Sequence, residues 1–133
     1  MAVGLSAEIN WNPVAGVRLG SAPLGVRSPP RDDLTIIELA AGSRAAAVFT
    51  RNAFCAAPVV VAREHLSQKA PRYLLINAGN ANAGTGSRGL ADARKCCQAL
   101  AERGACDAHE VLPFSTGVIG QHMPVERFPE AID

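Results

Sequence analysis

The sequence predicts an α/β fold in which helices pack on a mixed β-sheet. Three observations predict this class. Residues 72–77 form an apolar segment typical of a strand, residues 90–103 have the periodicity of an amphipathic helix, and a second apolar strand is expected at 110–116. A strand, a helix and a strand in this order form a βαβ unit, which makes the two strands parallel.

Size and composition indicate one globular domain over residues 1–133. The chain is 48% hydrophobic and 19% charged, which excludes a disordered protein. The net charge is +1, and Lys and Arg are scattered, so nothing favours a nucleic acid or a membrane surface as a partner. No apolar segment approaches the ~20 residues that span a bilayer. Residues 1–13 lack the pattern of a signal peptide, so we expect a cytoplasmic protein.

The first elements are expected to be short strands joined by turns. Residues 1–13 form a lead-in that Trp11 anchors. Single apolar residues between glycines over 14–26 predict one or two short strands, and Ser-Pro-Pro-Arg at 28–31 predicts a turn.

A β-hairpin is predicted over residues 34–50. Residues 34–39 are rich in β-branched side chains, which favours a strand. Ala-Gly-Ser at 41–43 predicts a turn. We expect 45–50 to return as the second strand, antiparallel to the first.

The middle of the chain holds an ambiguous segment and a buried strand. In 58–66 the spacing of Val61, Glu64 and His65 favours a short helix over the second half, whereas the run of valines favours a strand. The segment 72–77 is apolar, as expected for a central strand covered on both faces.

The helix over 90–103 is expected to end at Gly104. Its apolar stripe contains Leu90, Ala93, Cys97, Leu100 and Ala101, and the residues predicted on its polar face are Asp92, Lys95, Gln98 and Glu102. After the strand at 110–116, Pro124 opens a last helical segment over 125–132, which Pro129 interrupts.

Cysteines and histidines do not form a recognisable reactive or metal-binding pattern. They are Cys55, Cys96, Cys97, Cys106, His65, His109 and His122. The cysteines have no CxxC spacing and no metal-ligand spacing to a histidine, so we expect reduced, mostly buried thiols and no metal site. The histidines are expected to be solvated or structural rather than catalytic bases.

Two polar segments of small residues follow predicted strands and form the candidate site. One is residues 77–86 (NAGNANAGTG), and the other is Ser115-Thr116-Gly117. A hydroxyl beside an unencumbered backbone N–H gives two donors that can face one oxyanion of an acyl transfer. Each segment also has ordinary turn chemistry, so a self-bonded connection is the alternative.

A nucleotide site is the less favoured interpretation. Residues 84–89 have a G-x-G-x-x-G pattern before a helix, where a phosphate can bind. No Lys-Ser or Lys-Thr pair follows, and no acidic residue closes a second strand about 20 residues later. No serine lies in a G-x-S-x-G elbow, which argues against a serine hydrolase. The chain therefore offers oxyanion donors without a nucleophile or base, as half of an active site would.

The two motifs together resemble the arginine-biosynthesis glutamate N-acetyltransferase family, also called ornithine acetyltransferases. The similarity lies in Asn77–Asn82 with Thr85-Gly86, and in Ser115–Gly120 with Pro124 behind it. It extends from about Pro13 to Asp133 and includes the stretches Ala46–Thr50, Asn52–Val59 and Gly89–Arg94. Gly84 stands where many members have Cys, which argues against a thiol role there.

The resemblance implies a layered sandwich fold that is incomplete in this chain, and acetyl transfer from N-acetylornithine to glutamate. Such precursors cleave themselves into an α and a β chain, commonly α2β2, and the N-terminal Thr of the β chain is the nucleophile of a ping-pong cycle. The oxyanion hole of the family corresponds to Thr116 and Gly117. No cofactor is implied, although acetyl-CoA is a second acetyl donor in bifunctional members. Asn80 and Asn82 are candidates for substrate contact or for bracing the oxyanion turn.

The nucleophilic Thr of the family lies in a Lys-Gly-x-Gly-Met segment, which these 133 residues do not contain. We therefore expect this chain to be the N-terminal α-chain portion of a precursor. By itself it should neither transfer acetyl groups nor cleave itself, and it should expose apolar surface meant for its partner. A non-catalytic partner subunit of the same fold is the alternative.

Overall fold

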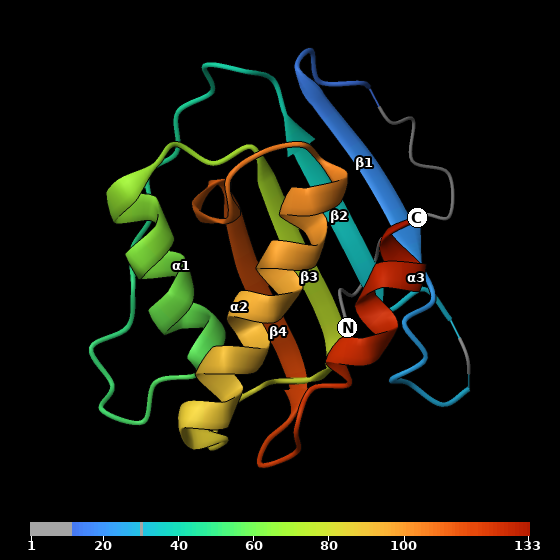
Figure 1. Ribbon diagram of the computed structural model, residues 1–133, viewed down its shortest axis with the longest axis vertical. Helices are drawn as coiled ribbons and strands as arrows, with labels where there is room; N and C mark the ends of the chain where they lie inside the picture. The colour runs from blue at the N-terminus through green and yellow to red at the C-terminus, as the bar shows by residue number, and fades with distance from the viewer. Residues whose placement is uncertain (1–11, 30) are drawn as a thin grey trace.

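The computed structural model describes residues 12–29 and 31–133, and in this part of the chain helices pack on a four-stranded sheet (Figure 1). The expectation for Trp11 lies outside the described residues. The elements are β1 (Val17–Ala22), β2 (Leu34–Leu39), α1 (Ala57–Gln68), β3 (Tyr73–Asn80), α2 (Gly86–Arg103), η1 (Ala108–Glu110), β4 (Val111–Val118), η2 (Val125–Arg127) and α3 (Phe128–Ile132).

The sheet is mixed, as predicted, with the strand order β1-β2-β3-β4. β1 and β2 are antiparallel, β2 and β3 are antiparallel, and β3 and β4 are parallel. The predicted βαβ unit is confirmed, because α2 connects the parallel neighbours β3 and β4. This unit brings the carboxyl ends of both strands to the same edge of the sheet.

The predicted hairpin between 34–39 and 45–50 is wrong. β2 pairs instead with β1, in a register that runs from Val17 opposite Leu39 to Ala22 opposite Leu34. Residues 45–50 form no strand. Both edges of β2 are taken by β1 and β3, and the alanines of 45–47 offer little side-chain packing to compete for either edge.

Helix α1 covers the whole ambiguous segment rather than its second half. Pro58 lies in the first turn, where its missing N–H costs nothing. The buried side chains recur at helical spacing, and they are Ala57, Pro58, Val61, Ala62 and His65. Burial of this stripe against the sheet outweighs the preference of the valines for extended backbone.

Helix α2 ends at Arg103, as predicted, but it begins at Gly86 rather than at Leu90, and one side chain is placed differently from the prediction. Gly104 ends the helix by donating its N–H to the Leu100 carbonyl oxygen, at 2.8 Å. Asp92, predicted on the polar face, is only 5% exposed. The buried stripe is wider than the sequence indicates because α1 and α3 also pack against this helix. Arg88 approaches Asp92 from the preceding turn, with Nε 3.7 Å from Oδ2.

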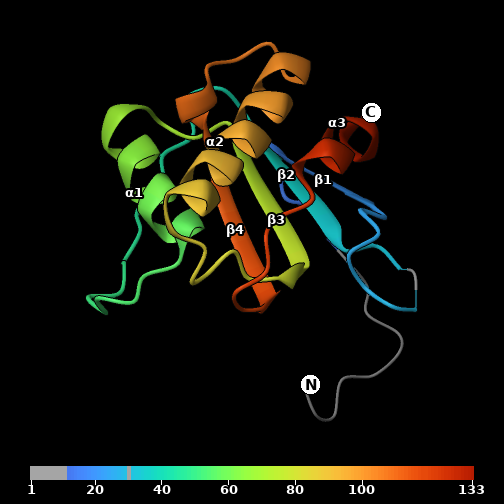
Figure 2. The same ribbon diagram turned by 60° about the horizontal axis from the view of Figure 1, so that its bottom comes forward.

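The three helices lie on one face of the sheet (Figure 2). The core between them includes Leu34, Leu75, Val61, Cys97, Leu100, Val111 and Phe128. Along β3, buried Tyr73 and Leu75 alternate with half-buried Leu74 and Ile76. The expectation that this strand is covered on both faces is therefore not met by the described residues.

The last helical segment is present as η2 followed by α3. Pro129 does not interrupt α3, because it lies in the first turn, where proline is tolerated. No helix in the described ranges is long and apolar enough to cross a membrane.

Candidate active site

The two polar segments predicted from the sequence lie side by side at the carboxyl ends of β3 and β4. Asn77 is opposite Ser115, Ala78 is opposite Thr116, and Gly79 is opposite Gly117. The parallel register therefore joins two motifs that are far apart in the chain. Thr116 and Gly117 are both exposed.

Close packing of two glycines shapes this end of the site. Gly117 has a φ of +137°, and a Cβ placed there would overlap the Gly79 carbonyl group and lie 2.6 Å from the Asn80 nitrogen. Gly79 has a φ of +104°, and its Cβ would lie 2.8 Å from Val26 Cγ1. Each position therefore requires glycine, for conformation and for space. No side chain at Gly117 screens its backbone.

The ladder between the two strands is irregular at the Ser115-Thr116-Gly117 motif. Asn80 is paired with both Thr116 and Val118, so the register shifts around Gly117. Such irregularities are common beside active sites, where they change the direction of one residue. The exposed residues Thr116 and Gly117 therefore lie where the regular pairing of β4 with β3 ends.

Asn80 connects β3 to the chain that follows the motif. Its side chain is buried, with 2% exposure. Nδ2 donates to the carbonyl oxygens of Gln121 and His122, both at 3.1 Å, and Oδ1 accepts from the N–H of Asn82 at 2.7 Å. The Asn80 carbonyl oxygen in turn accepts from Asn77 Nδ2 at 2.8 Å.

Asn82 makes its hydrogen bonds in a different direction, toward the starts of α1 and α2. Its Nδ2 donates to the Gly89 carbonyl oxygen at 2.9 Å, and its Oδ1 accepts from the Thr85 hydroxyl at 2.7 Å. The Ala57 N–H donates to the Asn82 carbonyl oxygen at 3.1 Å. The buried side-chain amides of Asn80 and Asn82 thus bond within the protein, which favours the bracing alternative. Substrate contact by these residues stays a prediction.

The glycine pattern at 84–89 crosses the start of α2 and serves packing. α2 begins at Gly86, so Gly89 is a helical residue and is buried. A Cβ on Gly89 would overlap the Thr85 hydroxyl and lie 2.5 Å from Asn82 Oδ1. This close approach gives Gly89 a reason to be glycine that involves no nucleotide.

A buried carboxylate that the sequence analysis missed holds the loop beside Gly79. Asp33 accepts four backbone N–H donors, from Leu24 at 2.5 Å, Gly25 at 3.2 Å, Val26 at 2.7 Å and Arg27 at 2.8 Å. Burial acts to raise the pKa of Asp33, but these donors lower it below the ordinary value of 3.8. Its only sequence signal is an Asp just before a strand, which is too common to identify it.

His65 and two of the cysteines are buried, and the other histidines and cysteines of the chain are half-buried or exposed. His65 is buried, with Nδ1 2.8 Å from the carbonyl oxygen of Val111, at the opposite end of β4 from Thr116. Burial lowers the pKa of His65, and it raises the pKa of Cys97 to about 12. All four cysteines are free thiols. Over residues 12–29 and 31–133, no group of three His, Cys, Asp or Glu side chains could hold a metal ion.

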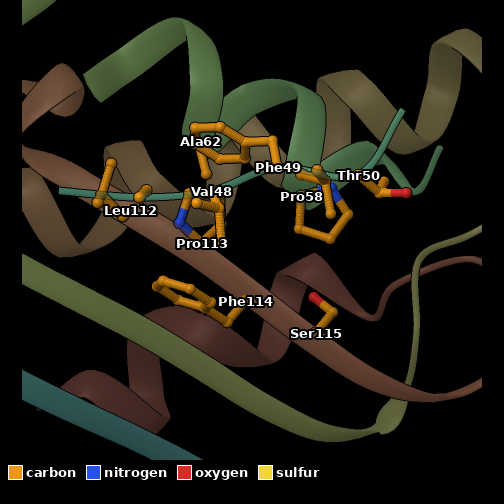
Figure 3. A pocket seen from close by; sticks show the side chains of 11 residues that line it. Val48, Phe49, Thr50, Pro58, Ala62, Leu112, Pro113, Phe114 and Ser115 are labelled. Atoms are coloured by element: carbon orange, nitrogen blue, oxygen red, sulfur yellow. The ribbon is translucent and has the colours of Figure 1, made fainter. Parts of the chain in front are cut away.

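An apolar groove of about 290 Å³ runs along the outer edge of β4 and reaches Ser115, next to Thr116 (Figure 3). Its walls come from the segment 47–50, from the start of α1 and from β4. The lining includes Val48, Phe49, Pro58, Val59, Ala62, Leu112 and Phe114. The groove has no charged side chain, so it suits an apolar group rather than an anion.

The chain matches the model of the ArgJ family over residues 18–133. It is similar to the arginine biosynthesis bifunctional protein ArgJ of Methylococcus capsulatus, with 57% identity over 126 residues that cover 95% of this chain and 31% of the relative. The corresponding protein of Pseudomonas fluorescens is 52% identical over 132 residues, which are 99% of this chain and 32% of the relative. The chain thus spans about a third of the length of these curated relatives.

Two solved structures have the same fold. One is an arginine biosynthesis bifunctional protein ArgJ from Bacillus halodurans, with a TM-score of 0.83 and 34% identity, covering 89% of this chain and 62% of that one. The other is an ornithine acetyltransferase of Mycobacterium tuberculosis in complex with ornithine, with a TM-score of 0.83 and 32% identity. It covers 89% of this chain and 64% of that one. This chain therefore has part of the ornithine acetyltransferase fold, and it belongs to the ArgJ family.

Proposed function

We propose that this chain is the N-terminal α-chain portion of a glutamate N-acetyltransferase, and that it supplies the oxyanion hole for acetyl transfer from N-acetylornithine to glutamate. One observation carries the proposal. In a chain of the ArgJ family, Thr116 and Gly117 lie exposed at the end of β4, on backbone fixed by the contact between Gly117 and Gly79.

In this mechanism the hydroxyl of Thr116 and the N–H of Gly117 donate to the acetyl oxygen as negative charge develops on it. The N-terminal Thr of a β chain attacks the acetyl carbon, the amide C–N bond breaks, and ornithine leaves with a proton on its amine. The amine of glutamate then attacks the acetyl-Thr ester and releases the Thr hydroxyl. Donors fixed in advance stabilise both oxyanions without reorganisation.

The same donors would serve acetyl-CoA as a second acetyl donor, because attack on its thioester passes through the same kind of oxyanion. We propose no resident cofactor or metal. The partner is the β chain of the same precursor, in an α2β2 assembly in the cytoplasm. The isolated 133-residue chain lacks the nucleophile and is expected to be inactive.

The test uses the full-length protein that contains this chain, extended to the length of its relatives. Thr116→Ala should lower kcat for acetyl transfer about 10²–10³-fold, the usual cost of one oxyanion donor. Thr35→Ala, on β2 and half-buried, is the matched control and should keep its kcat. A Thr116→Ala enzyme with wild-type kcat would contradict the role of Thr116. A full-length protein that neither cleaves itself nor transfers acetyl would favour the non-catalytic subunit.

A further inference from the structure

Four hydrogen bonds connect the chain that follows Gly117 to the end of β3 and the residues just after it. The Ala81 N–H donates to the Val118 carbonyl oxygen at 2.9 Å, and the Gly120 N–H donates to the Ala83 carbonyl oxygen at 2.8 Å. In the other two, the carbonyl oxygens of residues 121 and 122 both accept from the side chain of Asn80. The side-chain amide of Asn80 therefore donates two of these four hydrogen bonds.

Asn80 also lies at the irregularity of the ladder. It is paired with the residues on both sides of Gly117, namely Thr116 and Val118. A Cβ at Gly117 would lie 2.6 Å from the Asn80 nitrogen, so the backbones of the two residues are close together. Any shift of Asn80 would therefore move the strand end that carries the exposed donors.

We propose that Asn80 is a positioning residue for the oxyanion hole: it holds Thr116 and Gly117 in register by fixing the chain on their carboxyl side. The inference rests on the proposed function and adds a role for Asn80 that requires no contact with substrate. Catalytic groups must be held within about 0.5 Å of their productive positions, and buried hydrogen bonds from supporting residues supply that precision.

The chemistry of the amide explains why this position needs Asn. A primary amide has two N–H donors and an acceptor oxygen on one plane. Here both donors face backbone carbonyl oxygens, and the acceptor receives the N–H of Asn82. A carboxylate of the same shape keeps the acceptor but turns two hydrogen bonds into repulsion. A protonated carboxyl restores one donor.

Asn82 provides a matched comparator from the same loop. It is also buried, and its Nδ2 also donates to a backbone carbonyl oxygen, but that oxygen belongs to Gly89 in α2. Asn82→Asp and Asn80→Asp therefore make the same chemical change in similar surroundings. Asn80→Asp removes the donor that holds the chain after Gly117. Asn82→Asp removes a donor that holds the start of α2.

The experiment measures self-cleavage, melting temperature, kcat and KM for both variants in the full-length protein. Asn80→Asp should lower kcat about 10- to 100-fold, the range expected for a small misplacement of catalytic groups, with KM within about twofold of wild type. Asn82→Asp should lower the melting temperature by a similar amount with a much smaller loss of kcat. Equal losses of kcat in the two variants, or an unchanged kcat in Asn80→Asp, would overturn the inference.

The pH profile separates positioning from general stability. A carboxyl at position 80 would be buried against two carbonyl oxygens, which raises its pKa. The ratio of kcat for Asn80→Asp to kcat for wild type should therefore rise as the pH falls, because the protonated carboxyl regains a donor. A ratio that stays flat while the protein is folded would count against the proposal.

The outcomes distinguish this inference from the proposed function. A wild-type enzyme without acetyl transfer overturns both, because there would be no oxyanion donors to position. An active wild-type enzyme with Asn80→Asp at full kcat overturns the inference alone. If Asn80→Asp gives no folded protein, Asn80→Ser and Asn82→Ser take their places in the kcat comparison, with the same criterion.

Discussion

At the residue scale, the contact between Gly79 and Gly117 leaves the backbone at Gly117 without a side chain that would cover it. Each glycine has positive φ, and each occupies space that a Cβ would fill with an overlap. The sequence places both glycines in motifs of small residues but does not show that they touch. Their contact follows from the parallel register of β3 and β4.

Gly117→Ala in the full-length protein should therefore reduce both activity and stability. The Cβ would overlap the Gly79 carbonyl group, and alanine is strained at a φ of +137°. We expect roughly 1–3 kcal/mol of lost stability from strain of this kind, measured as a fall in melting temperature, and a loss of kcat. Gly20→Ala is the control, since it lies in β1 with no heavy atom within 4 Å of the added Cβ. Equal melting temperatures for the two variants would contradict this account.

The acidic residues show what the sequence could and could not predict at this scale. The stripe of Ala93 and Cys97 is visible from helical periodicity, and the structure confirms it. The burial of Asp92 depends on the neighbours of α2, which a single helix pattern does not reveal. The role of Asp33 depends on a loop that curls back around it, so nothing local to Asp33 identifies it.

At the element scale, the connection between β1 and β2 is held by one carboxylate. The side chain of Asp33 gathers the N–H groups of residues 24–27. This fixes the loop where Val26 packs near Gly79. The loop thus links the hairpin of β1 and β2 to the end of β3 that carries the site.

Asp33→Asn should destabilise the full-length protein by on the order of 2 kcal/mol at neutral pH, because one of the two carboxylate oxygens becomes an amide nitrogen that cannot accept, and the backbone N–H groups that it bonded lose their acceptor. The folded pKa of Asp33 lies below the ordinary value of 3.8. Its contribution is therefore fully present above about pH 4 and is lost as the pH falls through the lower folded pKa. The melting temperatures of wild type and Asp33→Asn should draw closer together as the pH is lowered from 7 towards the folded pKa of Asp33.

Asp32→Asn is the neighbouring control. Asp32 is exposed, and its carboxylate accepts only from the Ser21 hydroxyl, at 2.5 Å, among the hydrogen bonds of the described residues. It should leave the melting temperature nearly unchanged. An Asp33→Asn protein that is as stable as Asp32→Asn at pH 7 would show that the four N–H bonds contribute little.

Pairing of strands was the element-level feature that the sequence predicted least well. The β-branched and apolar residues of 34–39 and 72–77 predict that both segments are strands. The sequence predicts 45–50 as the partner of the first strand because that segment follows a turn. Residues 17–22 pair with 34–39 instead, through contacts across the loop that Asp33 holds. Local propensity carries no information about such contacts.

At the scale of the whole molecule, the helices of the part of the chain that the structure describes lie on one face of the sheet only. Apolar side chains on the strands therefore remain exposed, among them Leu19 at 71% and Phe114 at 43%. The resemblance predicted such surface, and patches of this kind mark sites of association. The solved relatives are longer chains, of which this one covers 62% and 64%.

The isolated 133-residue chain should consequently self-associate, because apolar area is removed from water when copies meet. Light scattering over a range of concentrations should show a molecular mass that grows with concentration, and the same sample should show no acetyl transfer. Replacing Leu19 with Ser should reduce the association. A concentration-independent monomer, or turnover above background, would contradict this expectation.

The hydrogen bonds from Asn80 to the chain after Gly117 also bear on the order of folding. The two hydrogen bonds from Asn80 span 41 and 42 positions, and α2 and β4 lie in the chain between the bonded residues. Contacts between residues far apart in the sequence form late, because the intervening chain must first close into a loop. The segment around Gly117 therefore reaches its final geometry only after β3, α2 and β4 have come together.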